Sequence, residues 1–378
     1  MNSLLIGLMG LFASTSFAAG PSSMATSDRT LWPDTTDSTA GFDRASRAEI
    51  LVFARALGET EADDDASLMS RFNIKAVDRA SLTRVRERLW KQLTRNYQIA
   101  ARSCGKEEVF CQPAADTAAL RKLASTFAAA PDAKYQPWYD NAVAFHRTYR
   151  DELLRLAALF GRTNSEIDTL GSDELRGDEL PDRQFELTFD DGPSRGGGTS
   201  DAVAAMLKEN QLSATFYVLG ERLDERIKAA VTPSLATLYA GQCVGLHGWE
   251  HKSHAHWAEW QSSVMRVNEL ARQTVPDAYV PMFRPPYGQR ATGSGSWFSA
   301  QGLKVALWNI DSQDWSVKVS TDQVGQRVLT LMLLWRHGVI LFHDIHPKAA
   351  KAVPWILQQT KNAGLAWGNC RAYAGKSK

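Results

Sequence analysis

Several classes of protein are disfavoured by what this sequence lacks. Its 43 Lys and Arg residues are balanced by 42 Asp and Glu, so the formal net charge of +1 offers no electrostatic basis for binding nucleic acid or anionic lipid. None of the four cysteines forms a C-x-x-C pair, which argues against a thiol redox motif and against a cysteine-ligated zinc site. Proline and glycine, at 14 and 26 residues, are not in excess, so the composition is that of an ordinary globular protein.

Long apolar runs are also missing. Residues 4–12 form one apolar run that is too brief to cross a bilayer, and no later run is long enough to anchor the chain. Small residues follow at 13–16, and Ser16-x-Ala18 resembles a small-x-small cleavage pattern. The sequence therefore predicts a signal peptide at 1–18 and a periplasmic or secreted protein. Because the segment before the run has no Lys or Arg, a buried N-terminal helix is the alternative interpretation.

Export would place the four cysteines in an oxidising compartment. Four cysteines allow three pairings, and the sequence alone does not choose among them. Cys104 and Cys111 enclose a short polar loop and are the favoured pair, which would leave Cys243 to pair with Cys370. Four reduced thiols are the alternative.

The chain divides by pattern into a leader, a helical region and an α/β region. Residues 19–43 lack apolar periodicity and are interpreted as a flexible leader. Residues 44–180 are interpreted as a helical region of unknown role, because apolar residues repeat there at three- and four-residue steps. The repeats are Leu82, Val85, Leu89, Leu93 and Tyr97, and Phe145, Tyr149, Leu153, Leu156 and Phe160. The third region, 181–370, has a different pattern.

Strands and helices alternate in that third region. We expect strands at 185–189, 214–219, 243–246, 305–310 and 338–342, and helices at 202–209, 229–239, 258–272, 324–335 and 349–362. Strict alternation predicts crossover units and a parallel sheet. About six or seven such units fit a closed or nearly closed barrel as well as an open sheet.

Residues that can carry chemistry follow these strands. Asp190 and Asp191 are adjacent at the end of the first strand, and like charges held this close disfavour joint ionisation unless a metal or a proton-transfer task makes the pair useful. His247 and His251, four residues apart, could supply further ligands to a metal with open coordination positions. Asp311, Asp314, His343 and Asp344 also follow predicted strands. This pattern indicates one shared site and a metal-assisted hydrolase.

Each motif also has an ordinary structural interpretation. Asp-Asp-Gly-Pro is typical of a turn, Arg284 could form a salt bridge in a loop, and Asp314 could cap a helix. His343 and Asp344 could be a buried polar pair. That all of them gather at strand ends within one domain favours the functional interpretation.

Five ordered motifs carry a resemblance to a known family. They are TFDDGP (188–193), HGWEH (247–251), RPPYG (284–288), DSQDW (311–315) and LFHD (341–344). In this order they resemble the polysaccharide deacetylases, the NodB-homology domain of carbohydrate esterase family 4. The resemblance covers about 185–368 and leaves out the helical region. It implies an α/β fold, with a distorted (β/α) barrel as the catalytic domain at 181–370 and an N-terminal all-helical region before it.

The resemblance also implies a role for each motif residue. Asp191, His247 and His251 would bind one divalent metal, zinc or else cobalt or another transition ion. Asp190 would be the general base, oriented by Arg284. His343 would be the general acid, tuned by Asp314. The backbone amide of Tyr287 would help to stabilise the oxyanion, and Trp315 and Leu341 would line the acetyl pocket.

Two residues depart from the family's usual pattern. Gly248 stands where Ser or Thr is common, so a hydrogen bond that steadies the metal loop would be missing. Glu250 adds a carboxylate beside His251 that could face solvent or enter the metal's surroundings. Neither change removes a ligand or a catalytic group.

The sequence therefore predicts a metal-dependent hydrolase that removes N-acetyl groups from a carbohydrate polymer or oligomer. Peptidoglycan, chitin-type oligomers and poly-N-acetylglucosamine are the candidate substrates. One alternative is an amidohydrolase acting on a small non-sugar amide. The other is a carbohydrate-binding protein on a deacetylase scaffold, against which the presence of both the acid and the base argues.

Overall fold

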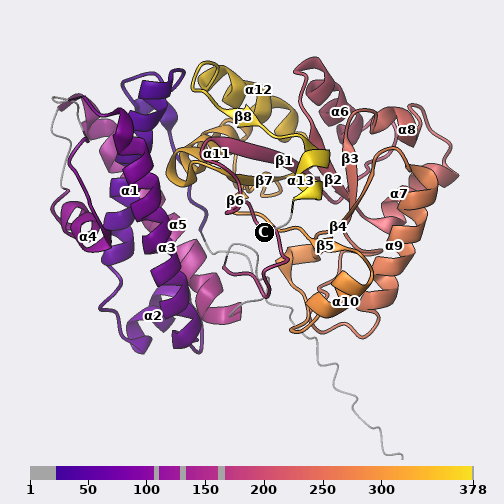
Figure 1. Ribbon diagram of the computed structural model, residues 1–378, viewed down its shortest axis with the longest axis horizontal. Helices are drawn as coiled ribbons and strands as arrows, with labels where there is room; N and C mark the ends of the chain where they lie inside the picture. The colour runs from indigo at the N-terminus through magenta and orange to yellow at the C-terminus, as the bar shows by residue number, and fades with distance from the viewer. Residues whose placement is uncertain (1–22, 106–109, 128–132, 161–166, 377–378) are drawn as a thin grey trace, which may run out of the picture.

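The computed structural model describes residues 23–105, 110–127, 133–160 and 167–376. The predicted signal peptide at 1–18 lies outside them. Helices of the N-terminal half stand on one side of the molecule, and the strands of the C-terminal half on the other (Figure 1). Among the described residues, no helix combines the length and the apolar character needed to cross a membrane.

Five α-helices are found in the described residues of the N-terminal half. They are α1 (Thr39–Gly58), α2 (Asp65–Phe72), α3 (Arg79–Ala100), α4 (Thr117–Thr126) and α5 (Gln136–Phe160), with short 3-10 turns at Arg29–Leu31, Ala101–Ser103 and Ala133–Tyr135. The predicted stripe of α3 is buried, and Asp78 caps this helix by accepting a hydrogen bond from the amide of Ser81. The helical character predicted for this region is confirmed.

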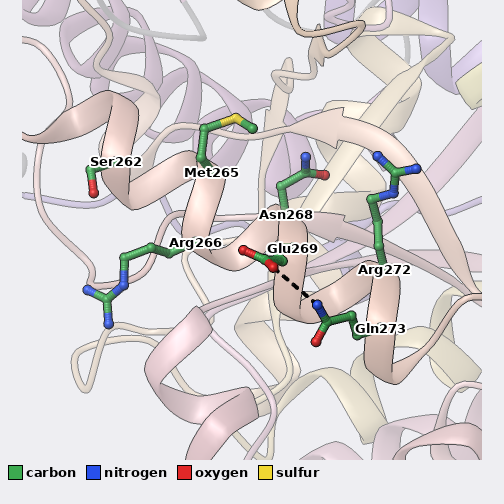
Figure 2. Close-up of a pocket in the computed structure, with 7 residues that line it drawn as sticks. All are labelled: Ser262, Met265, Arg266, Asn268, Glu269, Arg272 and Gln273. Carbon is green, nitrogen blue, oxygen red and sulfur yellow. Dashed lines mark hydrogen bonds between the residues drawn. The ribbon is translucent and has the colours of Figure 1, made fainter.

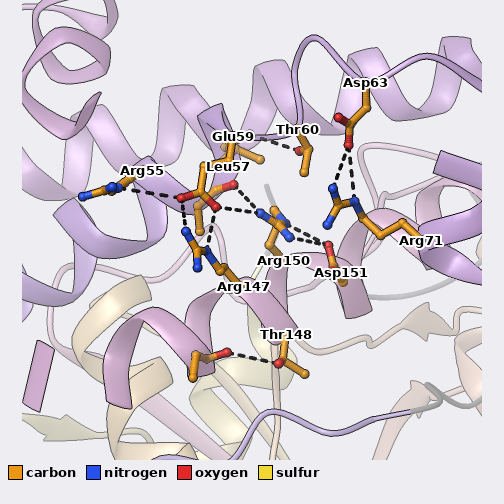
Figure 3. A network of polar contacts seen from close by, with 12 residues as sticks. Arg55, Leu57, Glu59, Thr60, Asp63, Arg71, Arg147, Thr148, Arg150 and Asp151 are labelled. Carbon is orange, nitrogen blue, oxygen red and sulfur yellow. Dashed lines mark hydrogen bonds and ion pairs between the residues drawn. The ribbon is translucent and has the colours of Figure 1, made fainter. Parts of the chain in front are cut away.

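Ion pairs between α1 and α5 hold these helices together at the surface (Figure 3). Glu59 accepts two hydrogen bonds from Arg147, at 2.6 and 2.8 Å, and lies near Arg55 and Arg150. Arg150 also bonds to Asp151 and to the carbonyl of Ala56. Because most of these groups are at least partly exposed to solvent, each such pair contributes at most about 1 kcal/mol to the free energy of unfolding.

The described part of the predicted leader is packed rather than flexible. Trp32 is buried, with its ring 4.9 Å from that of Trp138. The amide of Ala25 donates to Glu152 of α5, and α1 begins at Thr39 instead of residue 44. The polar composition of this segment does not reveal that its few apolar and charged side chains have partners elsewhere in the chain.

Eight strands of the C-terminal half form one sheet. They are β1 (Gln184–Asp190), β2 (Ala214–Val218), β3 (Cys243–Leu246), β4 (Tyr279–Phe283), β5 (Lys304–Val305), β6 (Ile310–Asp311), β7 (Gly338–His343) and β8 (Ala366–Trp367). Their order is β5-β4-β3-β2-β1-β7-β6, with β8 beside β1, and all these pairings are parallel. The predicted parallel sheet is confirmed.

The predicted strand at 305–310 is instead split into two short strands at opposite ends of this order. Lys304 and Val305 pair with β4, whereas Ile310 and Asp311 pair with β7. The four residues between them cross from one end of the sheet to the other, and Leu175 bridges to Ala306 within this crossing. A curled sheet whose ends are joined in this way is a distorted (β/α) barrel, as predicted.

The helices of this half are α6 (Thr199–Glu209), α7 (Gly220–Lys228), α8 (Leu235–Leu238), α9 (Trp260–Thr274), α10 (Gly295–Ala300), α11 (Thr321–Trp335), α12 (Ala349–Gln359) and α13 (Cys370–Gly375). The prediction of a single helix at 229–239 is wrong. The structure has α7 before it and only the short α8 within it, because Pro233 cannot donate its backbone nitrogen and Ser234 starts a new helix by capping Thr237.

Helix α11 joins the two halves. It is buried almost all round, which is typical of a helix enclosed by other elements. On the side of the helical region, Ser46 of α1 donates to the carbonyl of Leu333, and Asn96 of α3 donates to that of Trp335. The helices α1 and α3 therefore cover a surface of the barrel that would otherwise be apolar and exposed.

Two disulfides confirm the favoured pairing of the cysteines. Cys104 is bonded to Cys111, and Cys243 to Cys370. The second bond joins the start of β3 to α13, whose Tyr373 belongs to the cluster of buried side chains inside the barrel. Helix α13 thus closes the amino end of the strands, and the opposite end carries the site.

Candidate functional site

The carboxyl ends of four strands of the sheet, β1, β3, β4 and β7, bring the predicted site residues together. Asp190 ends β1 and His343 ends β7, and these two residues are paired across the strands. Asp191, His247 and Arg284 each follow directly after the last residue of a strand. Parallel strands place such residues at one end of the barrel, as the sequence predicts.

Asp191, His247 and His251 form a group that could hold a metal ion. One ligand atom of each lies within 4.8 Å of the others, and it is the only such group found among the described residues. Nε2 of His247 lies 3.3 Å from Oδ1 of Asp191, and Nε2 of His251 lies 3.4 Å from the same oxygen. That oxygen is buried and has no hydrogen-bond partner among the described residues.

The protonation of these groups fits a cation. Nδ1 of His247 lies 2.7 Å from the carbonyl oxygen of Arg284, so it carries a proton and leaves Nε2 as the nitrogen that faces Asp191. Burial lowers the pKa of His251 to about 4, so its imidazole is neutral at neutral pH. Two nitrogen lone pairs and a carboxylate oxygen then face one another, and a divalent cation between them would satisfy all three.

Asp191 is anionic in this setting. Its burial would raise the pKa, but the imidazoles of His247, His343 and His251 hold the pKa well below its ordinary value. The backbone of Asp191 is left-handed, with φ of 74°, and this turns its side chain away from the direction that a continuing strand would give. The two adjacent aspartates therefore contact different residues: Asp191 faces His247 and His251, and Asp190 binds Arg284.

Asp190 is held by Arg284. Its Oδ1 accepts a hydrogen bond of 2.8 Å from Nη1 of Arg284, and only 2% of Asp190 is exposed. The same guanidinium donates to Thr188 and to the carbonyls of Ala306 and Leu307, so its orientation is fixed by the barrel itself. Oδ2 of Asp190 lies 3.8 Å from Nε2 of His247 and is left facing the metal group.

His343 is held by Asp314 on the other side of the site. Nδ1 of His343 lies 2.8 Å from Oδ1 of Asp314, whose second oxygen accepts the backbone amide of His343 at 2.9 Å. Burial lowers the pKa of His343, but the charge and hydrogen bond of Asp314 outweigh this effect and raise the pKa to about 10. His343 is therefore protonated at neutral pH and can donate from Nε2.

The three residues expected to contact substrate lie in different surroundings. The ring of Tyr287 is 53% exposed and stands edge-on to His251, with 4.5 Å between ring centroids. Trp315 is 39% exposed at the surface. Leu341 is buried inside the barrel, in register with Thr188. Tyr287 thus lies beside the metal group, whereas Leu341 lies below the strand ends.

The two departures from the family pattern are accounted for by their surroundings. Gly248 has φ of +88°, and a Cβ there would lie 2.8 Å from Cε1 of the buried His254. A Ser or Thr would therefore not fit, and Ser263 instead binds the amide of the next residue, Trp249. Glu250 pairs with Lys252 at 2.5 Å near the surface, which matches the solvent-facing alternative.

Several residues around the site were not assigned by the sequence. His254, Arg290 and Glu174 are buried beside the metal and Tyr287 loops. Asp344, whose pKa is raised to about 7 by burial, packs against Gly192 next to the aspartate pair. Asp344 could be found from the sequence because it follows a predicted strand, but no local pattern marks His254, Arg290 and Glu174.

A hollow on the outer face of α9 has no part in this cluster (Figure 2). It is lined by Met265, Arg266, Arg272 and other residues of that helix, and it shares no residue with the strand-end site. Arg266 already covers the ring of Trp249 and Arg272 that of Tyr279. The strand-end cluster is therefore the candidate active site.

The chain is similar to proteins of one known family. The family described as polysaccharide deacetylase matches residues 177–306. YheN of Bacillus subtilis, a protein named as a polysaccharide deacetylase, is 30% identical over 201 residues, which are 50% of this chain and 67% of YheN. A peptidoglycan-N-acetylglucosamine deacetylase of Bacillus cereus is 33% identical over 193 residues, or 47% of this chain and 66% of that protein.

A similar solved structure is that of the Bc1960 peptidoglycan N-acetylglucosamine deacetylase. It is 23% identical, with a TM-score of 0.46, over 53% of this chain and 92% of that one. The chain spans about two thirds of the length of the first two relatives, and the family match begins at residue 177. The chain belongs to the polysaccharide deacetylase family.

Proposed function

We propose that this protein hydrolyses the N-acetyl groups of N-acetylglucosamine units in a carbohydrate polymer or oligomer, with the help of one divalent metal ion. The observation that carries the proposal is the convergence of three groups at one end of the barrel. These groups are the Asp191–His247–His251 cluster, the Asp190–Arg284 pair and the His343–Asp314 pair. An amide needs help at its carbonyl, at the attacking water and at its leaving nitrogen, and each group fits one of these needs.

Asp191, His247 and His251 would hold the metal, zinc or else cobalt or another transition ion, because one carboxylate and two imidazoles suit such ions. When bound, such an ion polarises a carbonyl oxygen and lowers the pKa of a coordinated water toward neutrality. The chain contributes the orientation of the ligands. His247 is fixed by its hydrogen bond to the carbonyl of Arg284, which keeps Nε2 directed at the site.

Asp190 would act as the general base. A carboxylate that is to accept a proton from water must face that water, and the hydrogen bond from Arg284 to Oδ1 fixes its orientation. Because Oδ1 is occupied by Arg284, the proton would be taken by Oδ2, which faces His247 and the metal group.

His343 would act as the general acid. Amide hydrolysis is completed only when the departing nitrogen is protonated, and a protonated imidazole near that nitrogen can supply the proton. Asp314 accepts the hydrogen bond from Nδ1 of His343, so the proton would be donated from Nε2. The backbone amide of Tyr287 would donate to the oxygen that becomes negatively charged, and Trp315 with Leu341 would enclose the acetyl methyl group.

Export to the periplasm or to the outside of the cell is part of the proposal. A signal peptide at 1–18 would direct export, and two disulfides in the described residues suit an oxidising compartment. Peptidoglycan, chitin-type oligomers and poly-N-acetylglucosamine contain the required N-acetyl group. Residues 44–180 would act as a support for the barrel, because α1 and α3 cover α11.

The test is an acetate-release screen of the purified protein against these three substrates. Release should be lost with a chelator and restored by zinc, and Asp190→Asn should abolish release while zinc binding persists. Release that is unchanged in the Asp190→Asn variant would contradict the mechanism. A protein that binds the polymer without releasing acetate would instead be a carbohydrate-binding protein, and release only from small non-sugar amides would favour the amidohydrolase alternative.

A further inference from the structure

Arg290 forms a buried ion pair with a residue far away in the sequence. It lies two residues after the RPPYG motif, and its guanidinium binds both carboxylate oxygens of Glu174, with 2.7 Å between Nε and Oε1. The side chains are 1% and 3% exposed. Glu174 belongs to the segment that connects the helical region to β1, so the pair joins the two halves of the chain at the edge of the candidate active site.

Arg290 also holds the backbone beside Tyr287 and that of the connecting segment. Nη1 donates to the carbonyl of Gly288 at 2.9 Å, and Nη2 donates to the carbonyl of Asp168 at 3.3 Å. Tyr287 has φ of 59°, a left-handed conformation that a residue with a side chain adopts only where its surroundings impose it. The contact with Gly288, the next residue, is one such constraint.

Arg290 also connects the Tyr287 loop to the metal loop. Its backbone forms a bridge with that of His254, three residues after His251. In the neighbouring position, Ser253 donates to Oε1 of Gln289 at 2.6 Å. The loop that carries Tyr287 and the loop that carries His251 are therefore held side by side at the residue whose side chain binds Glu174.

Glu174 is itself anchored from both directions. On the helical side, Arg84 and Arg88 of α3 bind Asp168 and the carbonyl of Ile167, at 2.7 and 2.5 Å. On the barrel side, the amide of Leu175 donates to Val305 of β5 at 2.9 Å. The position of the carboxylate is thus set by helix and strand rather than by a free loop.

We propose that Glu174 and Arg290 form a positioning pair that fixes the Tyr287 turn against the metal loop. The pair touches neither the metal group nor the reacting atoms, so it acts through the backbone of residues 287 and 288. This inference rests on the proposed function, in which the amide of Tyr287 faces the developing oxyanion. It extends the catalytic apparatus to the segment between the two halves of the chain.

A second buried Arg–Glu pair supplies a matched control. Arg29 and Glu49 are 4% and 1% exposed and lie within the N-terminal half, where Glu49 also binds Trp138 and His146. This pair contacts no residue of the candidate site. Breaking either pair leaves an unpaired buried guanidinium and lowers stability, but only the Glu174 pair should affect the Tyr287 turn.

The experiment compares Glu174→Gln with Glu49→Gln in the full chain, at a temperature where both variants are folded. We measure kcat and KM for acetate release, and the amide hydrogen exchange of residues 284–290. Glu174→Gln should lower kcat about 10- to 100-fold with KM changed less than about threefold, because misplaced donors lose transition-state stabilisation. It should also speed exchange in the Tyr287 turn, whereas Glu49→Gln should do neither.

Equal loss of kcat in both variants, or unchanged exchange in Glu174→Gln, would overturn the proposal. If Glu174→Gln does not fold, Arg290→Lys takes its place, because a single ammonium keeps the charge but cannot reach Glu174 and Gly288 together as the guanidinium does. If the wild-type protein releases no acetate from any substrate, the proposed function fails, and the exchange comparison alone decides whether the pair fixes the turn.

Discussion

The carbonyl oxygen of Arg284 accepts the hydrogen bond from Nδ1 of His247, so one residue orients a candidate metal ligand through its backbone while its side chain holds Asp190. The backbone contact does not depend on the side chain. The two tasks of Arg284 can therefore be separated by mutation.

Arg284→Lys should remove the base-positioning task and leave the ligand-orienting task. A lysine cannot reproduce the four hydrogen bonds of the planar guanidinium, so we expect acetate release to fall about 100-fold or more, the usual range for loss of a positioned base. Zinc affinity, measured by calorimetry, should change less than about threefold. An equal loss of zinc binding would show that the side chain, and not the carbonyl, supports His247.

Asp314→Asn should change how the activity depends on pH. Asp314 raises the pKa of His343 to about 10, against the effect of burial, so His343 keeps its proton over the whole neutral range. Removing the negative charge lowers this pKa, and the acid form is then lost at a lower pH. We expect the alkaline limb of the kcat profile to move to lower pH in Asp314→Asn, with activity at acidic pH affected less. If the alkaline limb stays in place, the proton for the leaving nitrogen is donated by a group other than His343.

The candidate site could be predicted from the sequence because its members follow strands. Asp190, His247 and His343 need only a strand before them and a parallel sheet around them to meet at one end of the barrel. Glu174 and Arg290 could not be predicted in this way. They are 116 residues apart, and neither lies at a strand end, so their pairing depends on how the connecting segment packs.

The fold shows the same division between local and non-local information. The predicted β1, β2, β3 and β7 are confirmed, because buried apolar runs mark them. β4 was not predicted, since Pro281 interrupts its pattern, and it is accommodated where the register between β3 and β4 shifts. The split of 305–310 into β5 and β6 depends on which neighbour each residue meets, and no local pattern specifies that.

Gly248→Ala should destabilise the protein more than Gly241→Ala does. Both glycines have left-handed backbones, with φ of +88° and +79°, so alanine is strained at either position. A Cβ at Gly241 meets nothing within 4 Å, whereas at Gly248 it meets His254 at 2.8 Å. We expect Gly248→Ala to cost at least about 1 kcal/mol more in the free energy of unfolding, and also to weaken zinc binding, which Gly241→Ala should not. Urea unfolding and calorimetry measure the two effects.

Glu186→Gln should stabilise the protein at alkaline pH. Glu186 points into the barrel, and burial raises its pKa to about 7, although the hydrogen bond from Gln184 opposes this. Between about pH 4.5 and 7, the unfolded chain releases a proton that the folded protein keeps, so the free energy of unfolding falls as pH rises through this window.

The glutamine variant does not titrate and avoids this loss. Its Tm should be close to that of the wild type at pH 4 and higher at pH 8, by the equivalent of about 2–3 kcal/mol. Activity should be unaffected, because Glu186 lies below the strand ends. A difference in Tm that is the same at both pH values would show that Glu186 has an ordinary pKa.

Removing the Cys243–Cys370 disulfide should lower stability more than removing the Cys104–Cys111 disulfide. The two bonds close segments with sequence separations of 127 and 7 residues. In the chain-entropy account, the longer segment restricts the unfolded chain more, by about 2 kcal/mol for this difference in length. Loss of the Cys243–Cys370 bond also releases α13 from the amino end of the barrel, where Cys370 and Tyr373 are buried with Tyr217 and Met282.

We therefore compare the paired serine variants Cys243→Ser/Cys370→Ser and Cys104→Ser/Cys111→Ser by urea unfolding. Equal urea midpoints in the two paired variants would contradict this prediction. They would mean that packing alone holds α13 in place.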